Sequence, residues 1–166
     1  MSRALCYIGL GANLGRASDT LQEVIGNLRQ EPLCHGLQAS SRYASKPMGP
    51  QDQPDFINAV VKLETPASPL TLLDLLQHYE QQAGRIRGQH WGPRTLDLDL
   101  LLYADRLINT PRLQVPHPGL TEREFVVTPL AEIAPTLVLP NGLTAAELAA
   151  TLPPRGLRKL DPAPVC

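Results

Sequence analysis

Residues 95–103 read TLDLDLLLY, and the alternation in this stretch is typical of a β-strand. Successive side chains of a strand point to opposite faces of its sheet, so Asp97 and Asp99 share one face and the leucines between them share the other. Two neighbouring carboxylates repel each other. A hard divalent cation relieves that repulsion, because Mg²⁺ commonly takes one or two carboxylates together with substrate phosphates. The alternative is an exposed strand face on which both acids pair with arginines such as Arg94.

Strands and helices alternate on both sides of this stretch. Ser18 can cap one helix, and Ser68 followed by Pro69 begins a second helix that ends near Gly84. Thr144 forms a possible capping box with Glu147 at the start of a last helix. The predicted strands lie at 5–10, 37–43, 56–64 and 95–103, a further helix is expected around 128–134, and residues 106–109 are expected to pair back on the strand 95–103 through a turn at Ala104 and Asp105.

The core order is therefore strand, helix, strand, strand, helix, strand, which is the split βαβ arrangement of ferredoxin-like α+β folds. We predict a sandwich with a central, mostly antiparallel sheet and helices packed on it. A length of 166 residues fits one domain. We place that domain at residues 1–152 and interpret 153–166, which holds four prolines, as a C-terminal tail.

Composition argues against several classes of protein. A net charge of -1 gives the chain no general attraction to nucleic acid or to an anionic membrane. The three cysteines are odd in number and form no CxxC pair, which disfavours a disulfide framework or a thiolate zinc site. We expect neither a secretory signal nor a membrane span, because the chain contains no sufficiently long apolar run. The expected location is the cytoplasm.

Arginines cluster beside the acidic strand. Arg85, Arg87 and Arg94 lie within ten residues of one another. Arginine and Mg²⁺ together commonly neutralise a phosphoryl group during its transfer. The acids and arginines together favour a nucleoside-triphosphate site over a network of surface ion pairs.

A glycine-rich segment near the start fits no known phosphate loop. Residues 9–15 read GLGANLG, in which the third glycine comes one residue too late for a dinucleotide-binding loop. The chain has no GxxxxGK[ST] run either. We therefore interpret this segment as a glycine-rich strand exit.

Other polar residues have both functional and structural explanations. Gln77 and Glu80 lie three apart on one helix face, where they could bind a nucleotide or simply face solvent. Asn58 lies in the apolar strand FINAV, where its amide could pair with a heterocyclic ligand or with the core backbone. His117 lies between two prolines and could contact phosphate or solvent.

Several stretches, in order along the chain, closely resemble the family of 6-hydroxymethyl-7,8-dihydropterin pyrophosphokinases. The most specific is HWGPRTLDLD at 90–99, and PMGPQDQPDFIN at 47–58 and VPHP at 115–118 also match. The resemblance begins at YIGLGANLG, residues 7–15, and runs to about Pro140. It implies a ferredoxin-like fold and an enzyme that transfers pyrophosphate from ATP to the pterin hydroxymethyl group, giving AMP and the pterin pyrophosphate in folate biosynthesis.

The resemblance also implies roles for individual residues. Asp97 and Asp99 would hold two Mg²⁺ ions on the triphosphate, and Arg85 and Arg94 would face the transferred group. The ATP side would be lined by Gln77, Glu80, Arg85, His90, Trp91, Arg94, Leu100, Arg112, His117 and Arg123. The pterin side would be lined by Ser45, Lys46, Pro47, Met48 and Asn58, with Phe56 and Phe125 sandwiching the ring.

We expect a cytoplasmic monomer whose partners are ATP and the pterin, without nucleic acid or membrane. The main alternative is a metal-dependent phosphohydrolase that uses the same acids and arginines. A more remote alternative is a ferredoxin-like nucleic-acid-binding module. Such modules need a basic sheet face with stacking aromatics, whereas this chain has only two Phe, one Trp and four Tyr.

Overall fold

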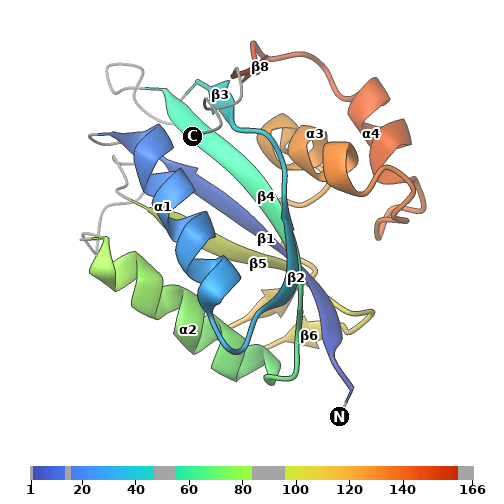
Figure 1. Cartoon of the computed structure of the whole chain (residues 1–166). Helices are drawn as coiled ribbons and strands as arrows, with labels where there is room; N and C mark the ends of the chain where they lie inside the picture. Colours follow the sequence, from blue (N-terminus) through green and yellow to red (C-terminus); the bar gives the residue numbers. More distant parts are fainter. Residues whose placement is uncertain (1, 14–15, 47–54, 84–95, 161–166) are drawn as a thin grey trace.

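The strand β1 lies between β4 and the edge strand β5 in the computed structural model of the chain (Figure 1). Both neighbours run antiparallel to β1. The structure describes residues 2–13, 16–46, 55–83 and 96–160. The strands of this sheet are β1 (Ala4–Ala12), β2 (His35–Ala39), β3 (Tyr43–Ser45), β4 (Phe56–Thr65), β5 (Asp97–Tyr103) and β8 (Arg158–Lys159), in the order β5-β1-β4-β3-β8 with β2 also pairing with β4.

Helices cover both faces of the sheet, which confirms the predicted α+β class (Figure 1). The first two helices share a core with Ile8 of β1, and the last two form a second core with Val60 of β4. No helix in the described ranges is long and apolar enough to cross a membrane. The helices are α1 (Ala17–Gln30), α2 (Pro69–Gln82), α3 (Glu124–Ile133) and α4 (Ala145–Thr151).

Local capping sets the start of two helices as predicted. Ser68 Oγ accepts the Thr71 N–H at 3.3 Å, and Pro69 is the first residue of α2. At α4, Thr144 Oγ1 accepts the Glu147 N–H at 3.1 Å, and the Glu147 carboxylate accepts the Thr144 N–H at 2.9 Å. Both predicted caps are therefore confirmed.

The other two helices begin earlier than predicted. Ser18 is not a cap, because α1 already begins at Ala17, which is buried against the core. Burial of the helix face sets this start, since no side chain caps it. The helix predicted at 128–134 begins at Glu124, because Val127 also packs into the second core.

The strand predicted at 37–43 is two strands, and Ser40 explains the break. Ser40 Oγ accepts the Val60 N–H at 2.9 Å, where a backbone carbonyl would accept it in a regular ladder. The Ser40 N–H in turn donates to the Val60 carbonyl at 2.9 Å. The pairing with β4 is thus interrupted, and it resumes at Tyr43.

The predicted pairing of residues 106–109 with the strand 95–103 is wrong. The chain turns at Ala104, which has a φ of 49° and donates its N–H to Leu5 of β1. The next strand, β6 (Ile108–Asn109), pairs instead with β7 (Gln114–Val115) in a separate two-stranded sheet. The reversal therefore comes one turn later in the chain than the sequence pattern indicated.

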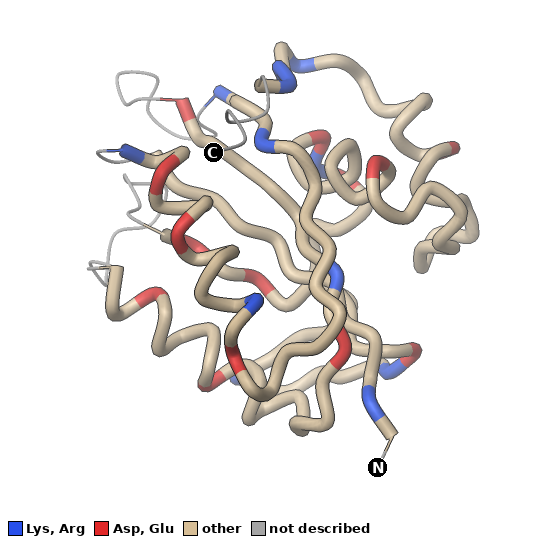
Figure 2. The backbone as a smooth tube through the Cα atoms, viewed as in Figure 1, with Lys and Arg blue, Asp and Glu red and all other residues tan. Residues whose placement is uncertain are grey.

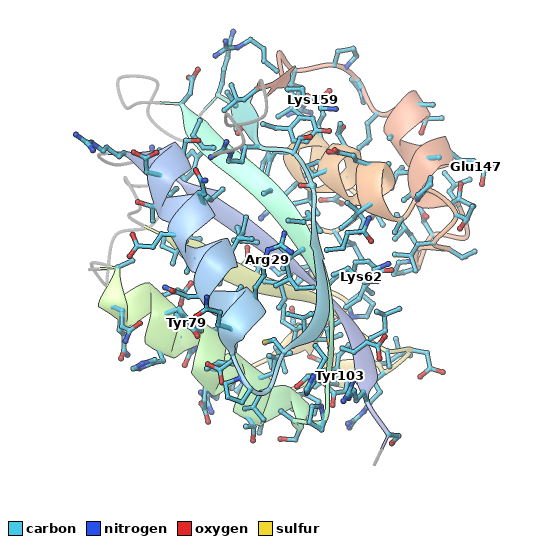
Figure 3. The ribbon with its side chains drawn as sticks, viewed as in Figure 1. Arg29, Lys62, Tyr79, Tyr103, Glu147 and Lys159 are labelled. Atoms are coloured by element: carbon cyan, nitrogen blue, oxygen red, sulfur yellow. The ribbon has the colours of Figure 1, made fainter. Side chains whose placement is uncertain are left out.

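The alternation in β5 is as predicted. Leu98 and Leu100 are buried in the core beneath α1 and α2, while Asp97 and Asp99 are partly exposed on the other face. Elsewhere in the same layer, Tyr79 of α2, labelled in Figure 3, donates its hydroxyl to the Glu31 carboxylate at 2.9 Å. That contact joins α2 to the end of α1.

A short strand lies within the segment predicted as a tail. In β8, Arg158 and Lys159 lie opposite Ala44 and Tyr43 of β3. The Leu160 N–H extends this pairing, because it donates to the Arg42 carbonyl at 2.9 Å. The division into a domain at 1–152 and a tail stays a prediction.

Glu132 fastens β3 to α3. Its carboxylate accepts the Ser41 N–H at 2.9 Å, the Ser41 hydroxyl at 2.7 Å and the Tyr43 hydroxyl at 2.7 Å. Lys159, labelled in Figure 3, lies 3.9 Å from the same carboxylate. Burial raises the pKa of Glu132, but these hydrogen bonds and the lysine lower it more, so its net pKa lies below its ordinary value.

Glu132→Gln is expected to reduce the free energy of unfolding by about 1–2 kcal/mol at neutral pH, because three donors lose a charged acceptor. Since the folded-state pKa is lowered, this stabilisation is complete above the ordinary pKa of 4.5 and is lost as pH falls through the lower folded-state pKa. Urea unfolding of both proteins at about pH 7 and about pH 3.5 measures the effect. Glu23→Gln removes an exposed charge from α1 and is the control. A stability gap of equal size at both pH values would contradict this assignment.

Candidate active site

The antiparallel register aligns four residues across the sheet, and we call them the cross-strand row. Gly11 of β1 lies opposite Asp97 of β5 on one side and opposite Asn58 of β4 on the other. Asn58 lies opposite Tyr43 of β3. Directly opposed residues of antiparallel strands point to the same face. Because Val60, two residues along from Asn58, belongs to the core beneath α3, the cross-strand row faces the α3 side of the sheet.

The acid pair is held by contacts on both sides of β5. The Asp99 side chain is 48% exposed, and its Oδ2 lies 3.9 Å from His117 Nε2. The N–H of Leu98, between the two acids, donates to Glu80 Oε2 at 2.8 Å. Glu80 is only 4% exposed. Its carboxylate therefore fixes the backbone that carries Asp97 and Asp99.

His117 is held as a neutral imidazole that can donate a hydrogen bond toward the acids. Its Nδ1 accepts the Gly119 N–H at 3.0 Å, which leaves the proton on Nε2. Burial lowers the pKa of His117, Asp99 raises it and Arg123 lowers it, and the net pKa lies below its ordinary value. The Nε2–H can therefore donate to an oxygen of a ligand bound beside Asp99.

A cavity of about 620 Å³ opens at the edge of β5, next to Asp99. Leu73 and Leu100 give it an apolar wall, while Arg112 and His117 add polar groups. Its volume lies within the range that small-molecule sites occupy, and its lining has the usual mixture of apolar walls and a few polar groups.

Arg112 joins this cavity to α2. Its guanidinium donates to Gln77 Oε1 at 3.0 Å and forms an ion pair with Asp74. Two residues predicted on the ATP side, Gln77 and Arg112, are thus in direct contact. Leu100 and His117, two others, line the same cavity.

The start of α3 brings Arg123, which was predicted on the ATP side, close to His117. The Arg123 guanidinium lies over the Phe125 ring, 5.8 Å from its centre. Arg123 also packs against Gly119, the backbone partner of His117. The start of α3 therefore lies near His117, and through it near Asp99.

Three residues of the predicted pterin side, Ser45, Phe56 and Asn58, lie together toward the other end of the cross-strand row. Asn58 is 4% exposed, and its Nδ2 donates to Ser45 Oγ at 2.7 Å. This orientation turns Oδ1 toward Gly11: a Cβ placed on that glycine would lie 3.2 Å from Oδ1 and 3.9 Å from the Phe56 ring. The Asn58 amide thus has its donor side tied to β3 and its acceptor side over β1.

Of the remaining predicted residues, the structure describes only Lys46. Lys46 is exposed at the end of β3, close to Gly156. Pro47, Met48, Arg85, His90, Trp91 and Arg94 lie outside the described residues.

Two features of the site were missed by the sequence interpretation. Gly11 was assigned to a strand exit and to a stretch that resembles the family, without a role of its own, although the spacing of Gly9 and Gly11 by two residues places both on one strand face. Of the segment 109–114, which lines the cavity, only Arg112 was predicted, and that through the family resemblance. Its position depends on the pairing of β6 with β7.

Comparison with known proteins gives consistent matches. The family model for 7,8-dihydro-6-hydroxymethylpterin-pyrophosphokinase matches residues 7–135. A 2-amino-4-hydroxy-6-hydroxymethyldihydropteridine pyrophosphokinase of Haemophilus influenzae is 48% identical over 156 residues, which cover 94% of this chain and 98% of the relative. A protein of the same name from Pseudomonas aeruginosa is 44% identical over 154 residues, 93% of this chain and 95% of the relative.

Solved structures support the fold. A crystal structure of HPPK-DHPS in complex with substrates matches with a TM-score of 0.68 and 12% identity, over 90% of this chain and 43% of that one. Plasmodium falciparum HPPK-DHPS with pteroate matches with a TM-score of 0.69 and 14% identity, over 89% of this chain and 42% of that one. The present chain therefore spans less than half the length of these two structures.

Ser45→Ala is expected to lower the free energy of unfolding by about 1–2 kcal/mol, because the buried Asn58 amide loses the acceptor of its N–H. Ser45→Thr keeps the hydroxyl and should stay close to the wild type. Urea unfolding of the three proteins measures the difference. If Ser45→Ala is as stable as Ser45→Thr, the contact between Ser45 and Asn58 does not hold the amide.

Proposed function

Since the chain belongs to the 7,8-dihydro-6-hydroxymethylpterin-pyrophosphokinase family, we propose that the cross-strand row and the neighbouring cavity carry out that family's reaction. The chain transfers pyrophosphate to the hydroxymethyl group of 6-hydroxymethyl-7,8-dihydropterin in folate biosynthesis, with ATP as the donor. This activity replaces the phosphohydrolase and nucleic-acid-binding alternatives. The observation that carries the proposal is the register that sets Asn58 and Asp97 on either side of Gly11.

ATP binds in the cavity at the edge of β5. Leu73 and Leu100 offer an apolar surface to the base, and Arg112 offers a cation and hydrogen-bond donors at the rim. The triphosphate then extends past His117 toward Asp99, where the His117 Nε2–H donates to a phosphate oxygen. In this arrangement the part of the nucleotide that reacts lies over β5.

Asp97 and Asp99 hold the metal. Their carboxylates share one strand face and are partly exposed, which suits a site whose coordination is completed by phosphate oxygens. We assign two Mg²⁺ ions to this pair. Bound Mg²⁺ neutralises charge on the triphosphate and orients its oxygens. Glu80 keeps the acid pair in place through the Leu98 N–H.

The pterin binds at the opposite end of the cross-strand row. Asn58 Oδ1 accepts hydrogen bonds from N–H groups of the ring, and Ser45 holds the amide in the orientation that this requires. Phe56 of β4 and Phe125 of α3 flank the ring, with Lys46 at the edge of the site. Pro47 and Met48 are assigned to the pterin side on sequence grounds alone.

The reaction is an in-line displacement. The hydroxymethyl oxygen forms a bond to the β-phosphorus, the bond from that phosphorus to the oxygen bridging the α-phosphate breaks, and AMP leaves with that oxygen. The hydroxyl proton passes to solvent. Catalysis consists of positioning and charge neutralisation. Arg85 and Arg94 supply further positive charge in this proposal, and His90, Trp91 and Arg123 complete the ATP side.

We also propose that the enzyme is a cytoplasmic monomer that binds no nucleic acid. Cys6 and Cys34 are free thiols, and burial raises the pKa of Cys6 to about 12 and that of Cys34 to about 11, so they behave as inert core residues.

Figure 2 shows basic and acidic residues interspersed along the described backbone. Mixed charge of this kind favours small-molecule substrates over a polyanion.

Product analysis tests the group transferred. With ATP, Mg²⁺ and 6-hydroxymethyl-7,8-dihydropterin, AMP should form in a one-to-one ratio with the pterin pyrophosphate. Separation of nucleotides and pterins by chromatography measures both products. ADP with a pterin monophosphate would contradict pyrophosphate transfer, and phosphate release without the pterin would indicate a hydrolase.

Asp97→Asn and Asp99→Asn test the metal site. Each should abolish the part of the affinity for a non-hydrolysable ATP analogue that depends on Mg²⁺, and should lower turnover on the order of 10²-fold or more, because a neutral amide cannot replace a carboxylate ligand. Calorimetric titrations with and without Mg²⁺ measure the affinity. Asp105→Asn, an exposed acid after β5, is the control. Retention of Mg²⁺-dependent affinity by both variants would show that the acids are structural.

A further inference from the structure

Two glycines of β1 lie on the face that carries the acid pair. Gly9 is opposite Asp99, and Gly11 is opposite Asp97. Neither has a positive φ, so the backbone conformation does not itself require glycine at either position. The two glycines differ in what lies above them.

Gly9 is covered by a neighbouring side chain, and there is room for a methyl group at this position. The three atoms nearest to a Cβ at this position would all belong to the Leu101 side chain, at 3.5 Å or more, which is ordinary contact distance. Leu101 is the extra residue of the irregularity in the pairing of β1 with β5, and it covers Gly9. Gly9 is accordingly buried.

Gly11 is different, because it remains partly exposed. The atoms nearest to a Cβ there would be Asn58 Oδ1 at 3.2 Å, the Ile57 carbonyl oxygen and the Phe56 ring. Thus Gly11 leaves bare backbone directly beside the acceptor atom of Asn58. Apolar packing of the kind that covers Gly9 is not what lies closest to it.

The position of Gly11 in the cross-strand row indicates that a substrate passes over its exposed backbone. Adjacent strands are about 4.8 Å apart, so Asn58 and Asp97 are separated by about 10 Å with Gly11 between them. A substrate that is held by Asn58 and reacts with a phosphate held at Asp97 must cross β1 at Gly11.

We propose that Gly11 is a positioning and specificity residue, whose bare backbone is the floor on which the pterin lies as it reaches the phosphate. This inference rests on the proposed function. A methyl group at this position would stand about 1.5 Å above the backbone and keep a ring a further 3.5–4 Å away. The pterin would then be lifted from both Asn58 and the phosphate.

Gly11→Ala tests the inference, with Gly9→Ala as a matched control on the same strand and face. Gly11→Ala should lower kcat/KM for the pterin on the order of 10²-fold, since a displacement of about 1 Å can have that effect. The Kd for a non-hydrolysable ATP analogue should stay within about twofold of the wild type in both variants, and Gly9→Ala should keep its kcat/KM for the pterin. Equal losses toward both substrates in Gly11→Ala, or no loss, would overturn the inference.

A second variant covers the case in which the methyl acts only by displacing Asn58. In Asn58→Ala the crowded oxygen is absent, so adding Gly11→Ala should fold readily and still reduce kcat/KM for the pterin. If the methyl has no effect in that background, Gly11 is not a floor for the substrate.

The wild type is assayed in parallel. Absence of AMP formation by the wild type would refute the proposed function itself. An active wild type together with a Gly11→Ala variant of normal activity would refute only the role of Gly11.

An independent observation concerns residues 155–160, which we call the C-terminal strap and which lie beyond the region matched by the family model. The Arg155 N–H donates to Glu124 at 3.1 Å, beside Phe125. Arg158 lies 3.6 Å from the Asp55 carboxylate, beside Phe56.

The C-terminal strap also extends the sheet beside the pterin site. Arg158 lies opposite Ala44, next to Ser45, and the Leu160 N–H donates to the Arg42 carbonyl at 2.9 Å. Three contacts of the strap thus involve Ala44, Asp55 and Glu124. These residues adjoin Ser45, Phe56 and Phe125 in the sequence. We infer that the C-terminal strap positions the walls of the pterin site, an inference that also rests on the proposed function.

Leu160→Pro removes the N–H that bonds Arg42, whereas Leu160→Ala keeps it and serves as the control. We expect Leu160→Pro to raise KM for the pterin on the order of tenfold through lost preorganisation, with an unchanged Kd for the ATP analogue. Leu160→Ala should retain the wild-type KM. Equal effects of the two variants, or an equal loss of ATP affinity, would show that the strap has no role specific to the pterin site. Wild-type AMP formation again tests the proposed function separately.

Discussion

The antiparallel register of β1 between β4 and β5 is the constraint on which the site depends. It sets Gly11 opposite Asp97 on one side and opposite Asn58 on the other. A shift by one residue would turn the side chains of Asn58 and Asp97 toward the opposite core. Because Ile8 and Val60 pack into different cores, the hydrophobic pattern holds this register on both faces. The same packing that stabilises the fold therefore fixes the spacing between the two positions at which we propose that the substrates are held.

Hydrogen bonds from neighbouring elements hold the cross-strand row in place at each end. On the acid side, Glu80 holds the Leu98 N–H from beneath the sheet, so the two carboxylates keep their positions although they repel each other. On the amide side, Glu132 of α3 holds Tyr43, and Ser45 of the same strand holds Asn58. Glu80 and Glu132 thus serve geometry, whereas we propose that the partly exposed Asp97 and Asp99 bind the metal.

The sequence was informative where periodicity alone decides the outcome. The alternation around Asp97 required only the two-residue repeat of a strand, and the cap at Ser68 required only neighbouring residues. The prediction failed where the interacting residues are far apart in the sequence. Ser40 interrupts a strand because its hydroxyl accepts the Val60 N–H from the neighbouring strand. Residues 108–109 pair with β7 because the chain reverses later than expected. The contacts of Glu80 and His117 likewise depend on tertiary packing, so the residue types were predictable but their geometry was not.

A crystal structure of the chain with Mg²⁺, a non-hydrolysable ATP analogue and 6-hydroxymethyl-7,8-dihydropterin would test the central claim most directly. We expect the pterin ring to lie over Gly11, with its polar edge at Asn58 Oδ1 and its hydroxymethyl oxygen directed toward a phosphate held at Asp97. The adenine should occupy the cavity beside Arg112. A pterin bound away from β1, or a triphosphate that does not approach the acid pair, would contradict this account.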